Sequence, residues 1–90
     1  MVWQIELSDT ARKSLAKMDK PVAARIRSFL RGRLAELEDP RSIGEALKGS
    51  SLGDFWKYRV GDYRIVAQIE DGALRILVVT LGNRREVYRA

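Results

Sequence analysis

Hydrophobic and polar side chains alternate at the start of the chain, over residues 2–7. Every second residue in this stretch is large and apolar, namely Trp3, Ile5 and Leu7. Because side chains alternate across an extended backbone, a period of two is typical of a half-buried strand. We therefore predict that the chain opens with a β-strand.

Two stretches with helical spacing follow. Ser8 offers a hydroxyl N-cap to the first, and Asp9 places a negative charge in its first turn. Asp19 is the candidate N-cap of the second, Pro21 is tolerated in its first turn, and Asp39-Pro40 ends it. The apolar stripes are Ala11, Leu15 and Met18 in the first helix and Val22, Ile26, Phe29, Leu30, Leu34 and Leu37 in the second. They predict a helical hairpin with one buried face.

One glycine interrupts the second helical pattern. Gly32 costs about 1 kcal/mol relative to alanine inside a helix, which argues against a helix that runs straight through. We expect a close contact with another backbone to explain it. After the helices, residues 40–54 are rich in Gly and Ser, so we predict a connecting loop with one apolar anchor at Leu47.

The second half of the chain has strand composition. Residues 55–60, 63–70 and 74–81 are separated by Gly61-Asp62 and Asp71-Gly72, the turn dipeptides of consecutive hairpins. We therefore predict an α+β fold with an N-terminal strand, a helical hairpin and then a three-stranded antiparallel meander. The helices are expected to pack on one face of the sheet.

Length and composition restrict the chemistry of this fold. Ninety residues suffice for one small domain, which we place over residues 1–90. The chain has no cysteine and no histidine, so thiolate nucleophiles, Cys or His metal ligands and Ser-His arrangements are excluded. We expect no metal and no small-molecule cofactor. Any catalysis then depends on Lys, Arg, Tyr, Asp or Glu.

The charge of the chain narrows its partners. Seventeen Lys and Arg against 12 Asp and Glu give a formal charge of +5. This favours nucleic acid, an acidic protein or an anionic surface, although some basic domains are merely soluble. The longest apolar run, at residues 76–81, is far shorter than the roughly 20 residues of a membrane span. No leader pattern follows Met1, so we expect a cytoplasmic, unprocessed protein.

Cations occupy alternate positions in the first predicted hairpin. Lys57 and Arg59 share one face of their strand, and Arg64 in the returning strand converges with them if the turn sets the right register. The opposite face holds Trp56, Tyr58 and Val60. Three cations on one face of the sheet indicate a site for a polyanion.

The tail adds further candidates. If the last strand is central in the sheet, its end brings Arg84 near the cationic face of the hairpin, with Tyr88 nearby. A metal-free ribonuclease activates the 2′-hydroxyl, stabilises the phosphorane oxygens and protonates the departing 5′-oxygen. Cations stabilise the phosphorane, and crowded cations favour a tyrosinate, so a tyrosine base is conceivable.

Three motifs are shared with a known family, in addition to the hydrophobic start and the helical hairpin. They are Ala46-Leu47-Lys48-Gly49, Tyr58-Arg59-Val60-Gly61-Asp62-Tyr63-Arg64 and Gly82-Asn83-Arg84-Arg85-Glu86-Val87-Tyr88. With them the chain closely resembles, over essentially its whole length, the bacterial RelE-type toxins of the RelE/ParE superfamily. The resemblance implies a RelE-like fold and a type II toxin that cuts mRNA in the ribosomal decoding site. It also implies a RelB-like antitoxin as partner.

The resemblance assigns roles to individual residues. Lys57 and Arg59 fall on the two basic strand positions, and Arg64 falls on the arginine that supports the phosphate. Arg84 falls on the tail arginine proposed as acid or charge stabiliser, and Tyr88 on the tyrosine proposed as base. These five are the candidate catalytic residues.

Further contacts are expected beside the catalytic set. Asn83 stands where several relatives have a histidine, which leaves more of the proton chemistry to the tail arginine and tyrosine. Lys48 and Arg85 are candidate contacts to RNA or the ribosome, together with the three hairpin cations. Basic helix residues are expected at the surface, where they can also hold ribosomal RNA phosphates; they are Lys13, Lys17, Lys20, Arg25, Arg27, Arg31 and Arg33.

Several residues also fit ordinary structural roles. The two strand cations fit solvated positions, Tyr88 fits a packing lid, and Arg64 can pair with Asp62 or Glu86. Tyr58 and Tyr63 fit core or turn supports better than platforms for stacked bases. We assign the tryptophans, Trp3 and Trp56, to the core.

Two other functions stay open at this point. A ParE-like protein has the same scaffold but inhibits DNA gyrase without cutting RNA, and fold alone does not decide between them. A basic domain that has lost its activity and only binds an antitoxin is the third interpretation.

Overall fold

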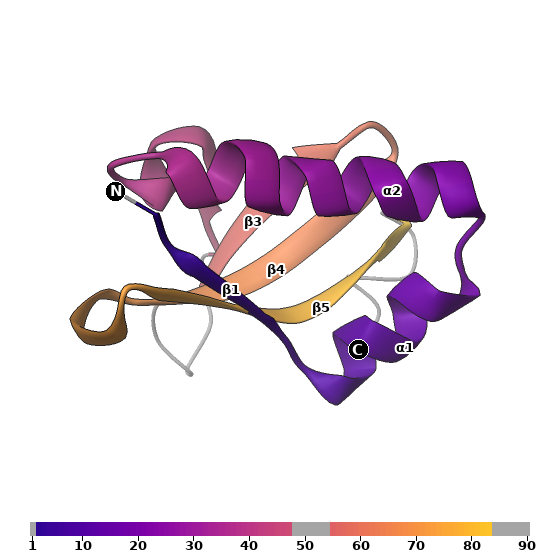
Figure 1. Cartoon of the computed structure of the whole chain (residues 1–90), viewed down its shortest axis with the longest axis horizontal. Coiled ribbons are helices and arrows are strands. Elements are labelled where there is room, and N and C mark those ends of the chain that lie inside the picture. Colours follow the sequence, from indigo (N-terminus) through magenta and orange to yellow (C-terminus); the bar gives the residue numbers. More distant parts are fainter. Residues whose placement is uncertain (1, 48–54, 84–90) are drawn as a thin grey trace.

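In the computed structural model, which describes residues 2–47 and 55–83, five strands form one sheet in the order β1-β5-β4-β3-β2 (Figure 1). β1 pairs in parallel with β5, and all other neighbours are antiparallel. The strands span Gln4–Leu7 (β1), Glu45–Ala46 (β2), Phe55–Val60 (β3), Tyr63–Glu70 (β4) and Arg75–Asn83 (β5). The predicted α+β class is confirmed, and the last strand of the meander is central.

Two strand boundaries differ from the prediction. β1 starts at Gln4 because the Trp3 N–H donates to the Ala35 carbonyl at 2.8 Å instead of pairing within the sheet. β5 starts after Leu74, whose φ of 49° lies in the left-handed region and whose N–H donates to the Asp71 carbonyl at 3.2 Å. In both cases the residue before the strand uses its N–H in a hydrogen bond outside the sheet.

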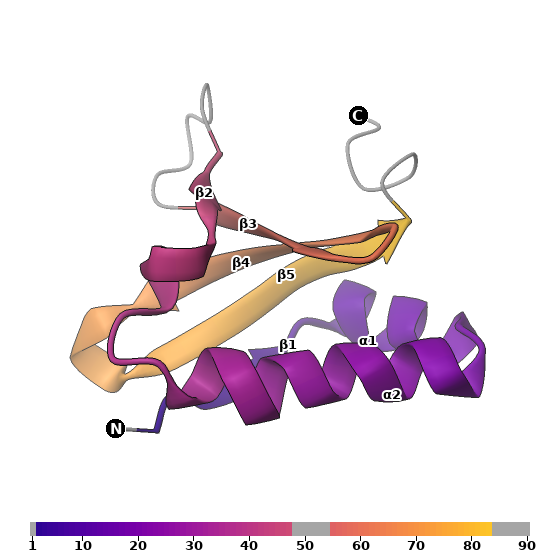
Figure 2. The same cartoon turned by 90° about the horizontal axis from the view of Figure 1, so that it is seen from above.

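Two helices, α1 (Asp9–Lys17) and α2 (Lys20–Ser28), cover one face of the sheet (Figure 2). Ser8 caps α1 as predicted: its hydroxyl accepts a backbone N–H of the first turn at 3.0 Å and donates to the Val79 carbonyl. Asp19 holds the N-cap position of α2 without a side-chain hydrogen bond. Among the described residues no helix has the length and apolar character needed to cross a membrane.

The helical run beyond α2 is irregular. It continues as a π-helical turn at Phe29–Arg33 and a 3-10 turn at Leu34–Glu36. The expected backbone contact at Gly32 is wrong, because a Cβ built there would meet nothing within 4 Å. The glycine belongs to the wider turn and faces open space.

The segment that follows is more ordered than the predicted loop. Pro40–Ile43 forms a 3-10 turn, which begins where the Asp39 carboxylate accepts the Arg41 N–H at 3.0 Å. The anchor of this segment is Pro40, which is fully buried, rather than Leu47, which is half-buried.

A short fifth strand was not predicted. β2 pairs with β3, so that Glu45 lies opposite Lys57. Gly44, just before β2, is required by close packing, because a Cβ there would lie 2.7 Å from Cε1 of the Tyr58 ring. The backbone of residues 40–46 therefore passes directly over Tyr58.

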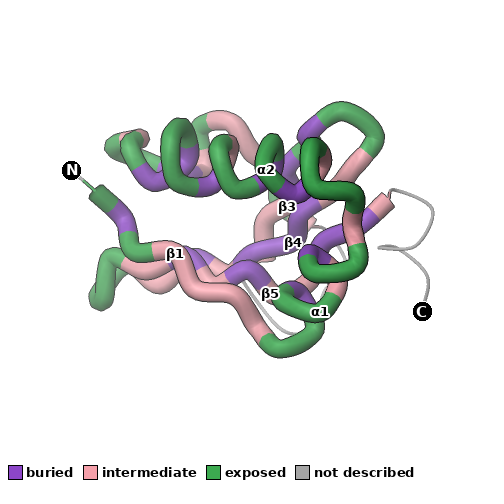
Figure 3. Tube along the Cα trace, turned by 45° about the vertical axis from the view of Figure 1, so that its right-hand side comes forward, coloured by how far each residue is buried: buried purple, intermediate pink, exposed green. Residues whose placement is uncertain are grey.

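The core lies between the helices and the facing side of the sheet (Figure 3). The predicted apolar stripes of the two helices are confirmed, because their buried residues pack against the core-facing residues of the strands. Trp3 is buried as expected, and Trp56 and Tyr63 are half-buried against the same cluster. The cluster consists of Trp3, Ala11, Leu15, Ala23, Ile26, Leu30, Leu34, Ala35, Tyr58, Val60, Ile65, Ala67, Ile69, Ile76, Val78 and Leu81.

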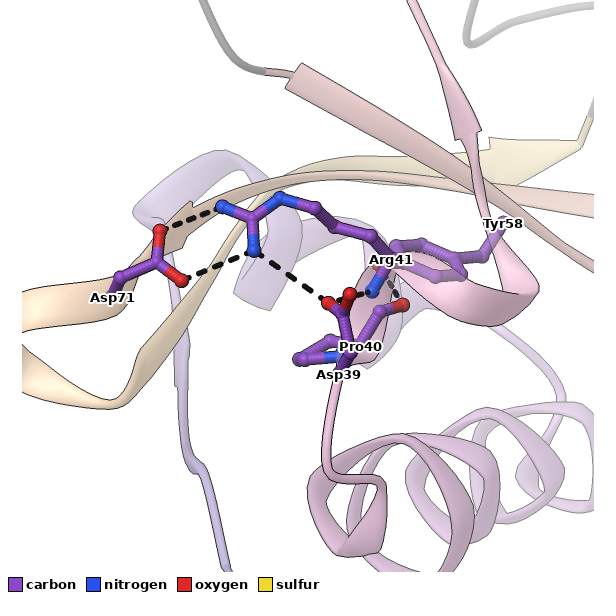
Figure 4. A network of polar contacts seen from close by, with 5 residues as sticks. All are labelled: Asp39, Pro40, Arg41, Tyr58 and Asp71. Atoms are coloured by element: carbon purple, nitrogen blue, oxygen red, sulfur yellow. Dashed lines mark hydrogen bonds and ion pairs between the residues drawn. The ribbon is translucent and has the colours of Figure 1, made fainter.

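Tyr58 holds the segment of residues 40–46 on the sheet. Its side chain is 2% exposed, and its hydroxyl donates to the Pro40 carbonyl at 2.8 Å (Figure 4). Burial raises the pKa of Tyr58 to about 12, and the Asp39 carboxylate also raises it, against the lowering effect of Arg41. The phenol is therefore neutral and serves as an anchor, in agreement with its predicted supporting role.

Arg41 ties the same segment to the far end of the sheet (Figure 4). Its Nη1 and Nη2 donate to the two carboxylate oxygens of Asp71 at 3.0 and 2.6 Å, and Asp39 lies 3.6 Å away. The guanidinium also lies 5.8 Å from the centre of the Trp56 ring. The hydrogen bond from Arg41 lowers the pKa of Asp71, so the pair is ionised at neutral pH.

Replacement of Tyr58 by Phe tests the anchor. The change leaves the Pro40 carbonyl buried without its partner, so we expect the free energy of unfolding to fall by about 1–2 kcal/mol in urea denaturation at neutral pH. Tyr63→Phe is the matched control, since no hydrogen bond of the Tyr63 hydroxyl is found in the described residues.

The same pair of variants has a signature in alkali. Because the folded pKa of Tyr58 is about 12 and that of an unfolded tyrosine about 10, this stabilisation is complete below pH 10 and is lost as the pH rises towards 12. The wild type and Y63F should lose stability more steeply than Y58F in that interval. Parallel pH profiles of all three proteins would contradict the assignment.

Candidate functional site

Three predicted site residues lie on the face of the sheet opposite the helices. Lys57 and Arg59 are on β3, and Arg64 is on β4. Arg59 and Arg64 are direct partners in the β3–β4 register, and the residue opposite Lys57 is Val66. The register thus brings the three cations together, as the sequence predicted.

The cations line a hollow of about 260 Å³. Its wall is completed by Ile43 and Glu45, from the segment that Tyr58 anchors. Ligand pockets for drug-sized molecules have volumes of about 300–1,000 Å³, so this hollow suits a smaller group such as one phosphodiester. We call it the cationic hollow.

The charges in the hollow are unequally compensated. Lys57 Nζ lies 3.5 Å from a carboxylate oxygen of Glu45. Arg64 Nη1 donates to the Gly61 and Tyr63 carbonyls at 3.3 and 3.2 Å, and these bonds orient the guanidinium without neutralising it. Within the described residues no ion pair joins Arg64 to Asp62.

Arg59 and Arg64 form a pair of like charges directly across two strands. Arg59 is exposed, and in the part of the chain that the structure describes no carboxylate lies within 4.0 Å of either guanidinium. Such cross-strand pairs are destabilising in the absence of a counterion. An anion bound between them would remove the repulsion, which is the electrostatic character required of a phosphate site.

The predicted tail residues, Arg84, Arg85 and Tyr88, and the loop residue Lys48 lie outside the described residues. The prediction for Arg84 required the last strand to lie inside the sheet, and β5 does lie between β1 and β4. The last two pairs of β5 join Gly82 to Arg64 and Asn83 to Tyr63, so the described part of β5 ends next to Arg64.

Sequence reasoning missed the wall formed by Ile43 and Glu45, because it treated their segment as a loop. Gly44 was the available signal, since a glycine between two strand-compatible residues often marks a close backbone approach. In the described residues, no three acidic side chains gather as a metal site would require, and the chain has no Cys or His. The described residues of this face supply three positive charges, Lys57, Arg59 and Arg64.

Comparison with known proteins places this geometry in a family. Residues 5–88 match the model of the ParE toxin of the type II toxin-antitoxin system parDE. The chain is 30% identical over 87 residues to Toxin RelE of Mycobacterium tuberculosis, covering 97% of this chain and 87% of that protein. It is 27% identical over 89 residues to Toxin RelG of the same organism, covering 99% of both.

A solved structure has the same fold. The toxin in the RelBE2 toxin-antitoxin complex from Mycobacterium tuberculosis superposes with a TM-score of 0.82 at 23% identity, covering 96% of this chain and 95% of that one. The match to the toxin family covers residues 5–88, and the α+β fold with its mostly antiparallel sheet agrees with it. The chain is therefore a type II toxin. The chain belongs to the RelE/ParE superfamily, as a RelE-type toxin.

Proposed function

We propose that this toxin is a ribosome-dependent mRNA endonuclease that acts in the cytoplasm and inhibits translation. The observation that carries the proposal is the cationic hollow, where Arg59 and Arg64 face each other across two strands with Lys57 beside them. A site with these charges matches one phosphodiester group. The identities of the RelE-type relatives support the same function.

The reaction follows from the charges. The 2′-oxygen attacks the adjacent phosphorus and loses its proton to a base, while the bond from phosphorus to the 5′-oxygen breaks and that oxygen takes up a proton. Lys57, Arg59 and Arg64 stabilise the extra negative charge of the phosphorane. We assign the proton transfers to Tyr88 as base and Arg84 as acid or charge stabiliser, as the family resemblance implies.

The ribosome supplies what the side chains lack. Without histidine, no side chain of this chain has an unperturbed pKa near neutrality, so general acid-base catalysis is weak. Holding the 2′-oxygen and phosphorus in line contributes several kcal/mol to the rate. A message fixed in the decoding site supplies that alignment, which explains why cleavage depends on translation.

A second candidate is ParE-type inhibition of DNA gyrase, which the name of the matching family model favours. The two functions make different demands on the sheet face. A protein that only binds gyrase has no need for two arginines converging on one anion. Discrete breaks in translated message support the nuclease, whereas a DNA-damage response without breaks supports the gyrase inhibitor.

We also propose a RelB-like antitoxin as the cellular partner, since the similar RelBE2 structure is a toxin-antitoxin complex. Acidic or apolar side chains of such a partner would cover the cationic hollow. Mixed with the product of the adjacent reading frame at micromolar concentration, the toxin should elute as one complex in gel filtration. Separate elution of the two proteins would exclude this partner.

Replacement of Arg64 by Ala tests the nuclease. Because its side-chain bonds in the described residues go only to two backbone carbonyls, the variant should fold normally. We expect cleavage of translated message, measured by primer extension, to fall about 100- to 1000-fold, as with other charge-stabilising groups. Arg12→Ala is the control, since it removes one exposed arginine from α1 away from the hollow. Wild-type rates in R64A would refute the proposal.

A further inference from the structure

A larger hollow lies next to the cationic hollow, between the α2 run and the β3–β4 hairpin. It has a volume of about 580 Å³, and three arginines line it: Arg25, Arg33 and Arg59. No acidic side chain is found among the described residues of its lining. We call it the arginine groove.

The arginines reach the groove from both sides. Arg25 and Arg33 come from the helical layer, and Arg59 comes from β3. A Cβ built on Gly61, in the β3–β4 turn, would lie 3.2 Å from Nη1 of Arg25. The guanidinium of Arg25 therefore extends from the helix to the hairpin turn, across one end of the groove.

Unlike three other arginines of the protein, the groove arginines have no counterion among the described residues. Arg12, Arg41 and Arg75 each have a carboxylate within 4.0 Å. In residues 2–47 and 55–83, none is found for the three groove arginines, all of which are exposed. The groove thus keeps a full positive charge, which favours a polyanionic ligand.

The groove adjoins the cationic hollow. Arg59 and Ile43 line both cavities, so they form the wall between them. The sides of the groove are partly apolar, at Phe29 and Val60, and Gly32 leaves its floor without a side chain. A chain of phosphates with attached bases that enters one cavity therefore passes over Arg59 into the other.

We propose that the arginine groove binds the backbone of a single RNA strand next to the phosphate held in the cationic hollow. This inference rests on the proposed nuclease function and extends it with a second phosphate subsite at Arg25 and Arg33. An acidic peptide is the alternative ligand, and it is made an outcome of the test below.

The test measures binding of RNA that cannot be cut, because every 2′-hydroxyl is methylated. A dinucleotide carries one phosphodiester and so occupies only the cationic hollow, whereas a nonanucleotide also reaches the groove. The dependence of the dissociation constant on salt is measured by fluorescence anisotropy for the wild type, R25Q/R33Q and R27Q/R31Q. The last variant is the matched control, since it removes two arginines from the same helical run that do not line the groove.

For the nonanucleotide, loss of two phosphate contacts should reduce the slope of log K against log salt by about 1.4 in R25Q/R33Q. The control should change the slope by less than half of that, and neither variant should weaken dinucleotide binding. Equal effects of the two variants, or none, would overturn the inference. So would unchanged RNA binding together with weaker binding of the antitoxin, which would make the groove a protein interface.

Cleavage assays on programmed ribosomes distinguish whether the RNA strand in the arginine groove is message or ribosomal RNA. If the groove holds message, R25Q/R33Q should cut a long message more slowly than the wild type does. This difference should disappear when the message is truncated on the side of the cut codon that occupies the groove. If it holds ribosomal RNA, the effect should persist on every truncated message. A wild-type cleavage rate of R25Q/R33Q on all messages would overturn both. Failure of the nuclease proposal itself is recognised separately, by wild-type cutting in R64A.

Discussion

The register between β3 and β4 determines where the charges of this protein lie. Tyr58 and Ile65 are register partners and are buried beneath the helices, which places Arg59 and Arg64 opposite each other on the other face. A slip of one residue would turn one of the two arginines into the core, where an unpaired charge costs several kcal/mol. The hydrophobic core therefore fixes the cationic hollow, although no core residue carries charge.

The hollow also depends on a segment outside the hairpin. Tyr58 uses its ring to fill the core and its hydroxyl to hold Pro40, so the backbone that follows lies against β3. This places Glu45 beside Lys57 and leaves the two arginines of the hollow without a carboxylate partner in the described residues. Arg41 and Asp71 neutralise each other at the opposite end of the sheet, so the positive charge concentrates around the hairpin turn.

The hairpin could be predicted from sequence because all of its determinants are local. Gly61 adopts a φ of 59° in the turn, and the alternation on both strands agrees with it. The role of Ser8 as N-cap of α1 could be predicted for the same reason, because its hydroxyl accepts an N–H three residues further along the chain. The parallel pairing of β1 with β5 is not local, since it joins segments about seventy residues apart, and the pattern gave only the existence of each strand.

Local helix geometry explains one error, and a long-range contact explains another. Gly32 was expected to touch another backbone and instead faces open space, because the helical run widens at this point. β2 has two residues, too few for a periodic pattern, and it forms only because the anchored turn before it brings it beside β3. The roles assigned to Arg84 and Tyr88 stay predictions, since both lie outside the described residues.

The central claim is that Arg59 and Arg64 act on one phosphodiester. A double-mutant cycle of R59A and R64A measures this directly, with the affinity for a 2′-O-methylated dinucleotide, which has one phosphodiester, as the readout. Two arginines that share one phosphate should give a coupling energy of about 0.5–3 kcal/mol, whereas independent sites add to within about 0.3–0.5 kcal/mol. Clear coupling is the predicted result, and simple additivity would contradict a shared phosphate site.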